Sequence, residues 1–171
     1  MEIRALGEAD VAIYWPLRLE ALRTDPEAFG SDYEESRQRP LTAVAERLRD
    51  DGASQFTLGA FDGDRLIGTV TFQRESRRKT QHKGWIQGMY VTPSARGRGV
   101  GRALMEAAIA RARTGPGLEQ IQLGVVATNV AAHRLYLSLG FQVYGTEPHA
   151  LKIAAQRFDE DLMVLFADPM C

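Results

Sequence analysis

The spacing of hydrophobic residues changes from segment to segment along the chain, and each spacing predicts a type of element. Apolar residues that alternate with polar ones predict strands, whereas apolar residues three or four positions apart predict helices. Strands are predicted over 3–6, 55–61, 66–73, 86–91, 121–125, 141–144 and 162–166. Helices are predicted over 8–23, over a short stretch within 27–39, and over 41–50, 103–113 and 130–139.

The order of these elements predicts the topology. Asp62, Gly63 and Asp64 form a hairpin turn, so the early strands pair antiparallel. A helix separates strand 86–91 from strand 121–125, so these two run parallel with a right-handed crossover. The segment 145–161 is either irregular or extends its flanking strands into a hairpin. We expect one domain over 1–171 of the α/β (α+β) class. It has a mixed, twisted sheet of about six to seven strands, about four flanking helices and a central parallel βαβ unit.

A glycine-rich turn, residues 96–102 (RGRGVGR), follows the strand 86–91 and begins the next helix. A helix N-terminus leaves N–H groups unpaired, and glycines let an anion approach them, so the turn suits a phosphate. The P-loop pattern fails because no lysine follows the glycines. The dinucleotide pattern fails because its third glycine falls on Arg102 or Leu104. An ordinary turn that only starts a helix remains the alternative.

Composition narrows the class of protein. A net charge of −1 gives no electrostatic basis for binding nucleic acid or an anionic membrane. Cys171 is the single cysteine, so no intramolecular disulfide is expected, and the three histidines lack the spacing of a metal site. The first residues, 1–4, have no apolar signal core, and no apolar run is long enough to span a membrane. We therefore expect a cytoplasmic protein.

Two motifs resemble those of one superfamily. The segment 96–101 (RGRGVG) is similar to the acyl-CoA-binding motif Gln/Arg-x-x-Gly-x-Gly/Ala of the GNAT superfamily of N-acetyltransferases. The segment 129–141 (NVAAHRLYLSLGF) resembles that superfamily's pattern Asn-x-x-Ala-x-x-Leu-Tyr followed by Gly-Phe. The resemblance covers roughly residues 85–144. The first half of the chain matches only in the order of its elements and looks like the small bacterial members.

The resemblance implies an N-acetyltransferase that uses acetyl-CoA as co-substrate and no metal. The acceptor would be a primary amine of a small molecule, a peptide or a protein, attacking directly in a ternary complex. An exposed strand edge suits the pantetheine arm of the cofactor, and the N–H groups of the glycine turn suit its pyrophosphate. The expected cofactor-binding residues are Met89, Tyr90, Val91, Arg96, Gly97, Arg98, Gly99, Val100, Gly101, Arg102, Asn129 and Tyr136.

Several of these residues have a simpler alternative role. The side chains of Arg98 and Arg102 are either phosphate contacts or solvated surface. Asn129 is a helix cap, with or without a contact to pantetheine. Tyr136 is the expected catalytic residue, because its hydroxyl can hydrogen-bond to the departing thiolate, and it lies two helical turns after Asn129. The alternative for Tyr136 is an aromatic residue of the core.

The sequence identifies no general base. The central strand, 85–91, has no acid, and Gln87 can position a water but cannot accept a proton. Glu34, Glu35 and His82 are candidates by loop position only, with solvated surface as the alternative.

The acceptor pocket is expected between the N-terminal helix and loop, the loop 74–83 and the segment 145–161. Its expected substrate-side residues are Phe29, Tyr33, Trp85 and Gln87. Acidic residues between 25 and 35 would suit a cationic amine by steering, or are simply a solvated loop. Two other functions stay open: a non-catalytic acyl-CoA-binding regulatory domain, and a nucleotide-binding fold of another kind. An exposed sheet edge would also allow a homodimer.

Overall fold

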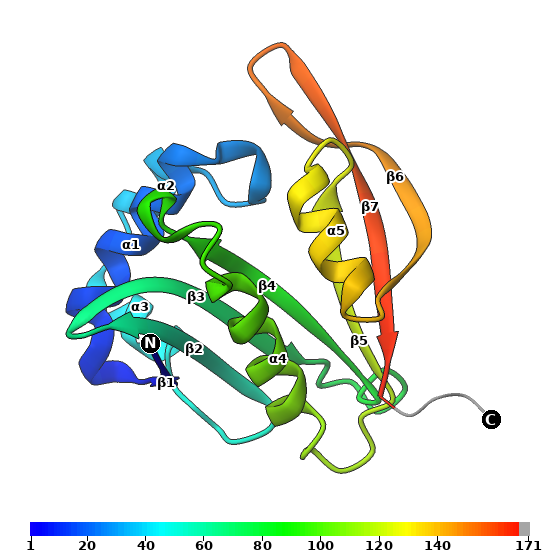
Figure 1. The fold of residues 1–171 in the computed structure, drawn as a ribbon, viewed down its shortest axis with the longest axis horizontal. Helices are drawn as coiled ribbons and strands as arrows, with labels where there is room; N and C mark the ends of the chain where they lie inside the picture. Colours follow the sequence, from blue (N-terminus) through cyan, green and yellow to red (C-terminus); the bar gives the residue numbers. More distant parts are fainter. Residues whose placement is uncertain (168–171) are drawn as a thin grey trace.

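The computed structural model describes residues 1–167, so Cys171 lies outside the described residues. A seven-stranded sheet with the order β1-β2-β3-β4-β5-β7-β6 forms the centre (Figure 1). The strands are β1 (Glu2–Leu6), β2 (Gln55–Asp62), β3 (Arg65–Arg74), β4 (Lys83–Val91), β5 (Gln120–Val126), β6 (Gln142–Ile153) and β7 (Gln156–Phe166). The α-helices are α1 (Val11–Thr24), α2 (Tyr33–Arg37), α3 (Leu41–Arg47), α4 (Val100–Ala112) and α5 (Val130–Ser138), with short 3-10 turns at Glu8–Asp10, Pro26–Ala28 and Pro93–Ala95.

The strand pairing confirms the predicted mixed sheet. β1 to β4 pair antiparallel in chain order, and β4 and β5 are parallel, as the crossover through α4 requires. The parallel pairing covers only Lys83–Trp85 against Gln120–Gln122. Beyond these residues β4 and β5 diverge, and Figure 1 shows the two strands meeting at one end and separating toward the other.

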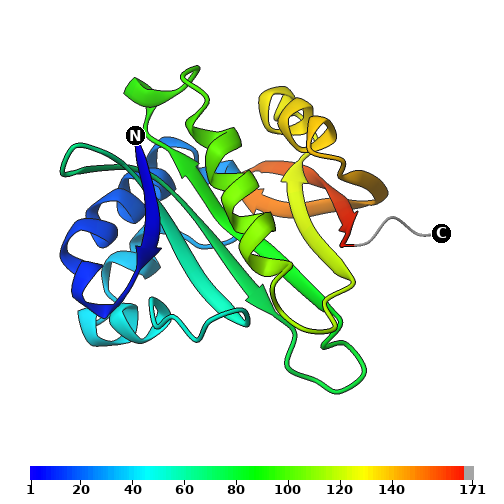
Figure 2. The ribbon, with the colours of Figure 1, turned by 60° about the horizontal axis from the view of Figure 1, so that its bottom comes forward.

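Two apolar layers cover opposite faces of the sheet. The larger cluster joins α4 and α5 to one face, and Phe56, Phe72 and Leu104 are fully buried in it. The smaller cluster packs Leu17 and Leu22 of α1 against the other face near β1. Figure 2 shows α4 in front of the strands and the N-terminal helices behind them. The α1 side is thinner, and this leaves part of the sheet uncovered on that side.

Several element boundaries differ from the sequence prediction. The helix predicted over 41–50 ends at Arg47, and the helix predicted from residue 103 starts at Val100. The segment 145–161 extends its flanking strands into a hairpin, because β6 and β7 pair from Gln142–Val164 to Ile153–Gln156, with two register shifts. The bulges explain why the alternation of this segment was hard to read. Within residues 1–167 no helix is long and apolar enough to cross a membrane.

Candidate active site

A large open cleft lies where β4 and β5 separate. It has a volume of about 1760 Å³, above the range of about 300–1,000 Å³ that holds one drug-sized ligand, so it has room for two. Its walls include the carboxyl ends of the parallel strands, Tyr90–Val91 and Val125–Val126, where ligands bind in sheets of this kind. The remaining lining comes from the N-terminal segment, the start of α4, α5 and the β6–β7 hairpin.

The start of α4 presents unpaired backbone donors to this cleft. Gly97 and Gly99 have φ values of +75° and +80°, and a Cβ built on either would meet no atom within 4 Å. The helix has no side-chain cap, and Ala103 is the first residue to donate to its N-cap, Gly99. The preceding N–H groups are therefore free for a ligand, and the positive end of the helix dipole lies beside them. This geometry suits a phosphate group.

The arginines of the glycine turn are engaged with the protein. Arg96 donates through Nε to the carbonyl of Val91 at 2.9 Å and forms an ion pair with Asp25. Arg102 donates to Ser138 Oγ at 2.6 Å. Arg98 pairs with Asp62 at 3.1 Å and does not line the cleft, so its expected phosphate contact finds no support. The backbone of the turn, rather than its guanidinium groups, is the free part of this surface.

The edge of β4 that faces the cleft is bulged and unpaired. Gly88 has a φ of +63°, and one extra residue on β4 lies between the pairs Thr69–Tyr90 and Thr71–Gln87. A glycine inside a strand suggests a bulge or a close backbone approach, and Gly88 lies at a β-bulge. Met89 and Val91 line the cleft, whereas the ring of Tyr90 is buried and its hydroxyl donates to Glu20 at 2.8 Å. Only the backbone of Tyr90 can therefore serve a ligand at this edge.

Tyr136 lies on α5 beside the opening between the strands. Its side chain is 7% exposed, and its ring centroid lies 6.0 Å from that of Phe141. Burial raises the pKa of Tyr136 to about 12, so its hydroxyl keeps its proton at neutral pH. Tyr136 is at once a core residue and part of the cleft wall. Asn129 caps α5, accepting from the N–H of Ala132 at 3.1 Å, and also lines the cleft.

The face of the sheet toward α1 is polar where the cleft exposes it. Thr57 and Thr71 hydrogen-bond to each other at 2.9 Å, and Gln87 donates to Gln73 at 3.1 Å. Trp85 lines the same floor and donates through Nε1 to Glu75 at 3.1 Å. Because strand residues alternate between faces, these side chains lie opposite the apolar cluster under α4. A polar floor suits a hydrophilic acceptor.

Two acidic side chains lie on the wall of the cleft that the β6–β7 hairpin forms. Glu147 and Glu160 are directly opposite each other on β6 and β7, and both line the cleft. A Cβ built on Gly124 of β5 would lie 3.2 Å from Glu160 Oε2, so the glycine leaves room for this carboxyl group. Burial and then the charge of Glu147 raise the pKa of Glu160. The sequence does not predict this pair, because only the hairpin register brings the two residues together.

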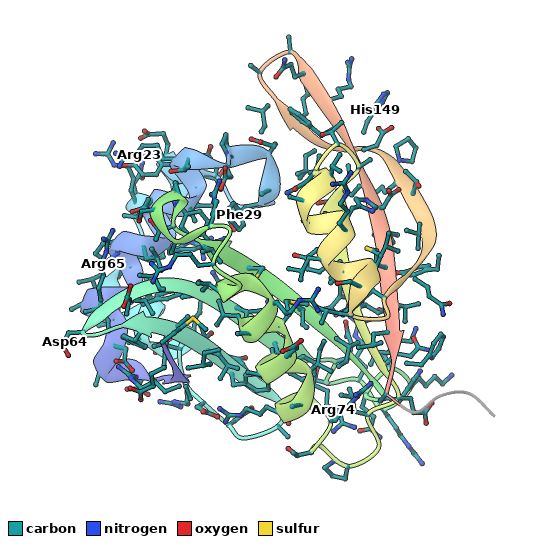
Figure 3. All side chains as sticks on the ribbon, in the orientation of Figure 1. Arg23, Phe29, Asp64, Arg65, Arg74 and His149 are labelled. Carbon is teal, nitrogen blue, oxygen red and sulfur yellow. The ribbon has the colours of Figure 1, made fainter. Side chains whose placement is uncertain are left out.

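Some expected residues lie away from the cleft. Tyr33 is on α2, where its ring packs with the α1 cluster and faces Arg23 at 5.8 Å, so it does not line the cleft. Glu34, which pairs with Arg37, Glu35 and His82 are also absent from the lining. The loop 74–83 joins β3 to β4 at the end where β4 meets β5, opposite the open end. Phe29, by contrast, lies on the wall, as Figure 3 shows.

The part of the chain that the structure describes contains no set of side chains that could bind a metal ion. Histidine, cysteine, aspartate and glutamate side chains form no group of three or more there that could hold an ion.

Comparison with protein-family models matches residues 18–141 to the acetyltransferase (GNAT) family. A mycothiol acetyltransferase from Geodermatophilus obscurus is 36% identical over 127 residues, which cover 70% of this chain and 39% of that protein. The chain thus spans well under half the length of this curated relative.

Solved structures resemble the whole fold. A GCN5-related N-acetyltransferase from Kribbella flavida has a TM-score of 0.80 at 28% identity, with 96% of each chain covered. A putative acetyltransferase from Salmonella typhimurium, solved with its cofactor acetyl-CoA, has a TM-score of 0.82 at 25% identity. That match covers 100% of this chain and 96% of the other.

Proposed function

Because this chain belongs to the GNAT acetyltransferase family, we propose that it transfers the acetyl group of acetyl-CoA to a primary amine. The observation that carries the proposal is the uncapped, glycine-rich start of α4, which faces a cleft between two diverging parallel strands. The acceptor attacks directly while both substrates are bound. The cleft is large enough for two ligands, which supports this order of events.

The residues present fit acetyl-CoA as the first substrate. Free N–H groups between Gly97 and Arg102 match a pyrophosphate, which is an anion with several acceptor oxygens. The unpaired edge of β4 between Gly88 and Val91 matches the amide groups of pantetheine, which can pair with a strand as another strand does. Acetyl-CoA supplies the acetyl group as a thioester and leaves as a thiol.

The remaining catalytic roles are assigned to the side chains of Tyr136 and Glu160. The neutral hydroxyl of Tyr136 donates a hydrogen bond that stabilises the departing thiolate, and the second proton lost by the attacking nitrogen goes to that sulfur. Glu160 accepts a proton from the ammonium group of the acceptor, since its raised pKa makes its carboxylate a better base than an ordinary glutamate. Glu147 keeps the pKa of Glu160 raised through its charge.

Calorimetric titration with acetyl-CoA tests the first half of the proposal, with NAD and ATP as controls. We expect micromolar binding of acetyl-CoA alone. Release of free thiol in the presence of primary amines tests the second half. Binding without thiol release on any amine would favour a non-catalytic acyl-CoA-binding domain, and tighter binding of NAD would favour another nucleotide-binding function.

Replacing Gly99 with alanine is expected to weaken acetyl-CoA binding about tenfold. The left-handed conformation at Gly99 strains any Cβ by about 1–2 kcal/mol, and relief of that strain turns the N–H groups of the turn away from the ligand. Isothermal titration measures the effect. Gly63→Ala is the matched control, since Gly63 also has a positive φ and open space around it but lies outside the cleft. Equal loss of affinity in both variants would contradict the assignment.

A further inference from the structure

Arg18 of α1 is a half-buried cation without a partner. Its Nη1 is inaccessible to solvent and, within residues 1–167, has no hydrogen-bond partner. The guanidinium carbon lies 4.5 Å from the centroid of the Phe29 ring, so the cation rests on an aromatic face. Both residues line the cleft. A guanidinium group has five N–H donors that need acceptors. A buried charge without a counter-ion also destabilises the fold, so an arginine at this position suggests a functional role.

The charges around Arg18 are of the same sign. Arg39 and Arg47 also line the cleft, and neither forms an ion pair in the described part of the chain. Burial lowers the pKa of Arg18, and the charges of Arg47 and Arg39 lower it further, against the opposing influence of Tyr14. The cluster formed by Arg18, Arg39 and Arg47 is referred to below as the arginine cluster.

The carboxylates of the cleft do not neutralise this cluster. Asp25 is held by Arg96, and none of the other acids that line the cleft, Glu27, Glu46, Glu147 and Glu160, forms an ion pair with Arg18. The acidic residues of the N-terminal loop therefore do not make the part of the cleft around the arginine cluster suited to a cationic acceptor. Within residues 1–167 the arginine cluster has no ion-pair partner, and an anion is the ligand that would neutralise its charge.

Arg18 also lies next to the bulge of β4. A Cβ built on Gly88 would be 4.0 Å from Arg18 Nη1 and 3.7 Å from Thr71 Oγ1. In the proposed function the acetyl group is presented at this unpaired strand edge. An anionic group of the acceptor that binds Arg18 is thus close to the acetyl group. Within the acceptor, only a few bonds can separate this anionic group from the attacking nitrogen.

We propose that the acceptor is a small amino acid, whose carboxylate binds the arginine cluster while its amino group faces Glu160. This inference rests on the proposed function and names its substrate class. Arg18 meets the carboxylate beside the bulge, and the two acids on the opposite wall meet the ammonium group. The polar floor of Thr57, Thr71 and Gln87 lines the same cleft.

A matched comparison of acids and amides tests the proposal. Free thiol release is measured with saturating acetyl-CoA, first on single L-amino acids and then on the corresponding L-amino acid amides, which keep the amine and lose the negative charge. We expect at least one amino acid to have a kcat/KM about 100-fold above that of its own amide, because the amide leaves the arginine cluster unpaired. Equal kcat/KM values for acids and amides would overturn the inference while leaving the proposed function intact.

Arg18→Met assigns the effect to this residue. The variant is expected to lower kcat/KM for the amino acid about 100-fold, and to lower the ratio of the acid value to the amide value by a similar factor. It should also raise the thermal midpoint by about 2 °C or more, since an unpaired buried charge gives way to an apolar chain on Phe29. Arg23→Met is the control on the same helix: Arg23 lies over Tyr33, on the outer edge away from Phe29 (Figure 3). An unchanged acid-to-amide ratio in Arg18→Met would contradict the proposal.

A binding measurement separates this inference from the proposed function. Saturation-transfer NMR with a pool of L-amino acids, without acetyl-CoA, should give signals that are absent for the pool of amides and lost in Arg18→Met. If acetyl-CoA does not bind in the calorimeter, the proposed function fails, and this NMR result still decides whether the arginine cluster takes a carboxylate. Equal signals from both pools would overturn the inference.

Discussion

Replacing Tyr136 with phenylalanine is expected to lower kcat by about 100-fold and to leave the affinity for acetyl-CoA unchanged. The change removes one oxygen and keeps the ring that packs on Phe141, so the core stays intact. Burial raises the pKa of Tyr136 to about 12, and the hydroxyl therefore remains protonated over the pH range of an assay. The hydroxyl can therefore act on the leaving sulfur only as a hydrogen-bond donor, and phenylalanine has no such donor.

The measurement is steady-state release of thiol together with calorimetric titration of acetyl-CoA. Tyr144→Phe provides the control, because Tyr144 is 50% exposed on β6 and lies outside the cleft. Loss of activity with an equal loss of cofactor affinity would assign Tyr136 to binding. Full activity in Tyr136→Phe would leave it as a core residue.

Glu160→Gln is expected to lower kcat/KM by about 100-fold or more and to remove the acidic limb of its pH profile. In the wild-type protein, kcat/KM should fall as the pH falls through the pKa of Glu160, because the protonated carboxyl group can no longer accept the proton of the acceptor. Burial and the charge of Glu147 raise this pKa, so the limb lies above the usual range of a glutamate. A pH series of thiol release between about pH 5 and 9 records the limb.

Glu147→Gln is the diagnostic partner of this variant. Removing the charge opposite Glu160 lowers the pKa of Glu160, and the acidic limb should move to lower pH with a small change in the maximal rate. Glu160→Gln should thus remove the acidic limb of the pH profile, whereas Glu147→Gln should move it to lower pH. A limb that persists unchanged in Glu160→Gln would show that another group accepts the proton.

The fold was largely predictable because its signals are local. The alternation of apolar residues, the turn at Asp62–Asp64 and the glycines that flank α4 each depend on a few neighbouring residues. The structure confirms the mixed sheet that they imply, with antiparallel early strands and one parallel pair. The glycine turn and α5 line the same opening, because each follows the carboxyl end of one of the two parallel strands.

The acceptor side was not predictable for a physical reason. Glu147 and Glu160 become neighbours only through the register of a hairpin with two shifts, and a sequence pattern does not specify such a register. Arg18 looks like a surface arginine on an amphipathic helix, and its burial depends on Phe29, which approaches from a separate loop. Tyr33 shows the converse: an aromatic residue near the expected pocket packs into a different cluster.

The ion pair between Arg96 and Asp25 joins the cofactor turn to the segment that carries Phe29. Arg96 also holds the carbonyl at the end of β4, so one guanidinium group touches the turn, the strand edge and the acceptor wall. Any ligand that draws Arg96 toward a phosphate changes the environment of that wall. By thermodynamic linkage, the two substrates then alter each other's dissociation constants by the same factor. We therefore expect the two substrates to bind with coupled affinities, and not independently.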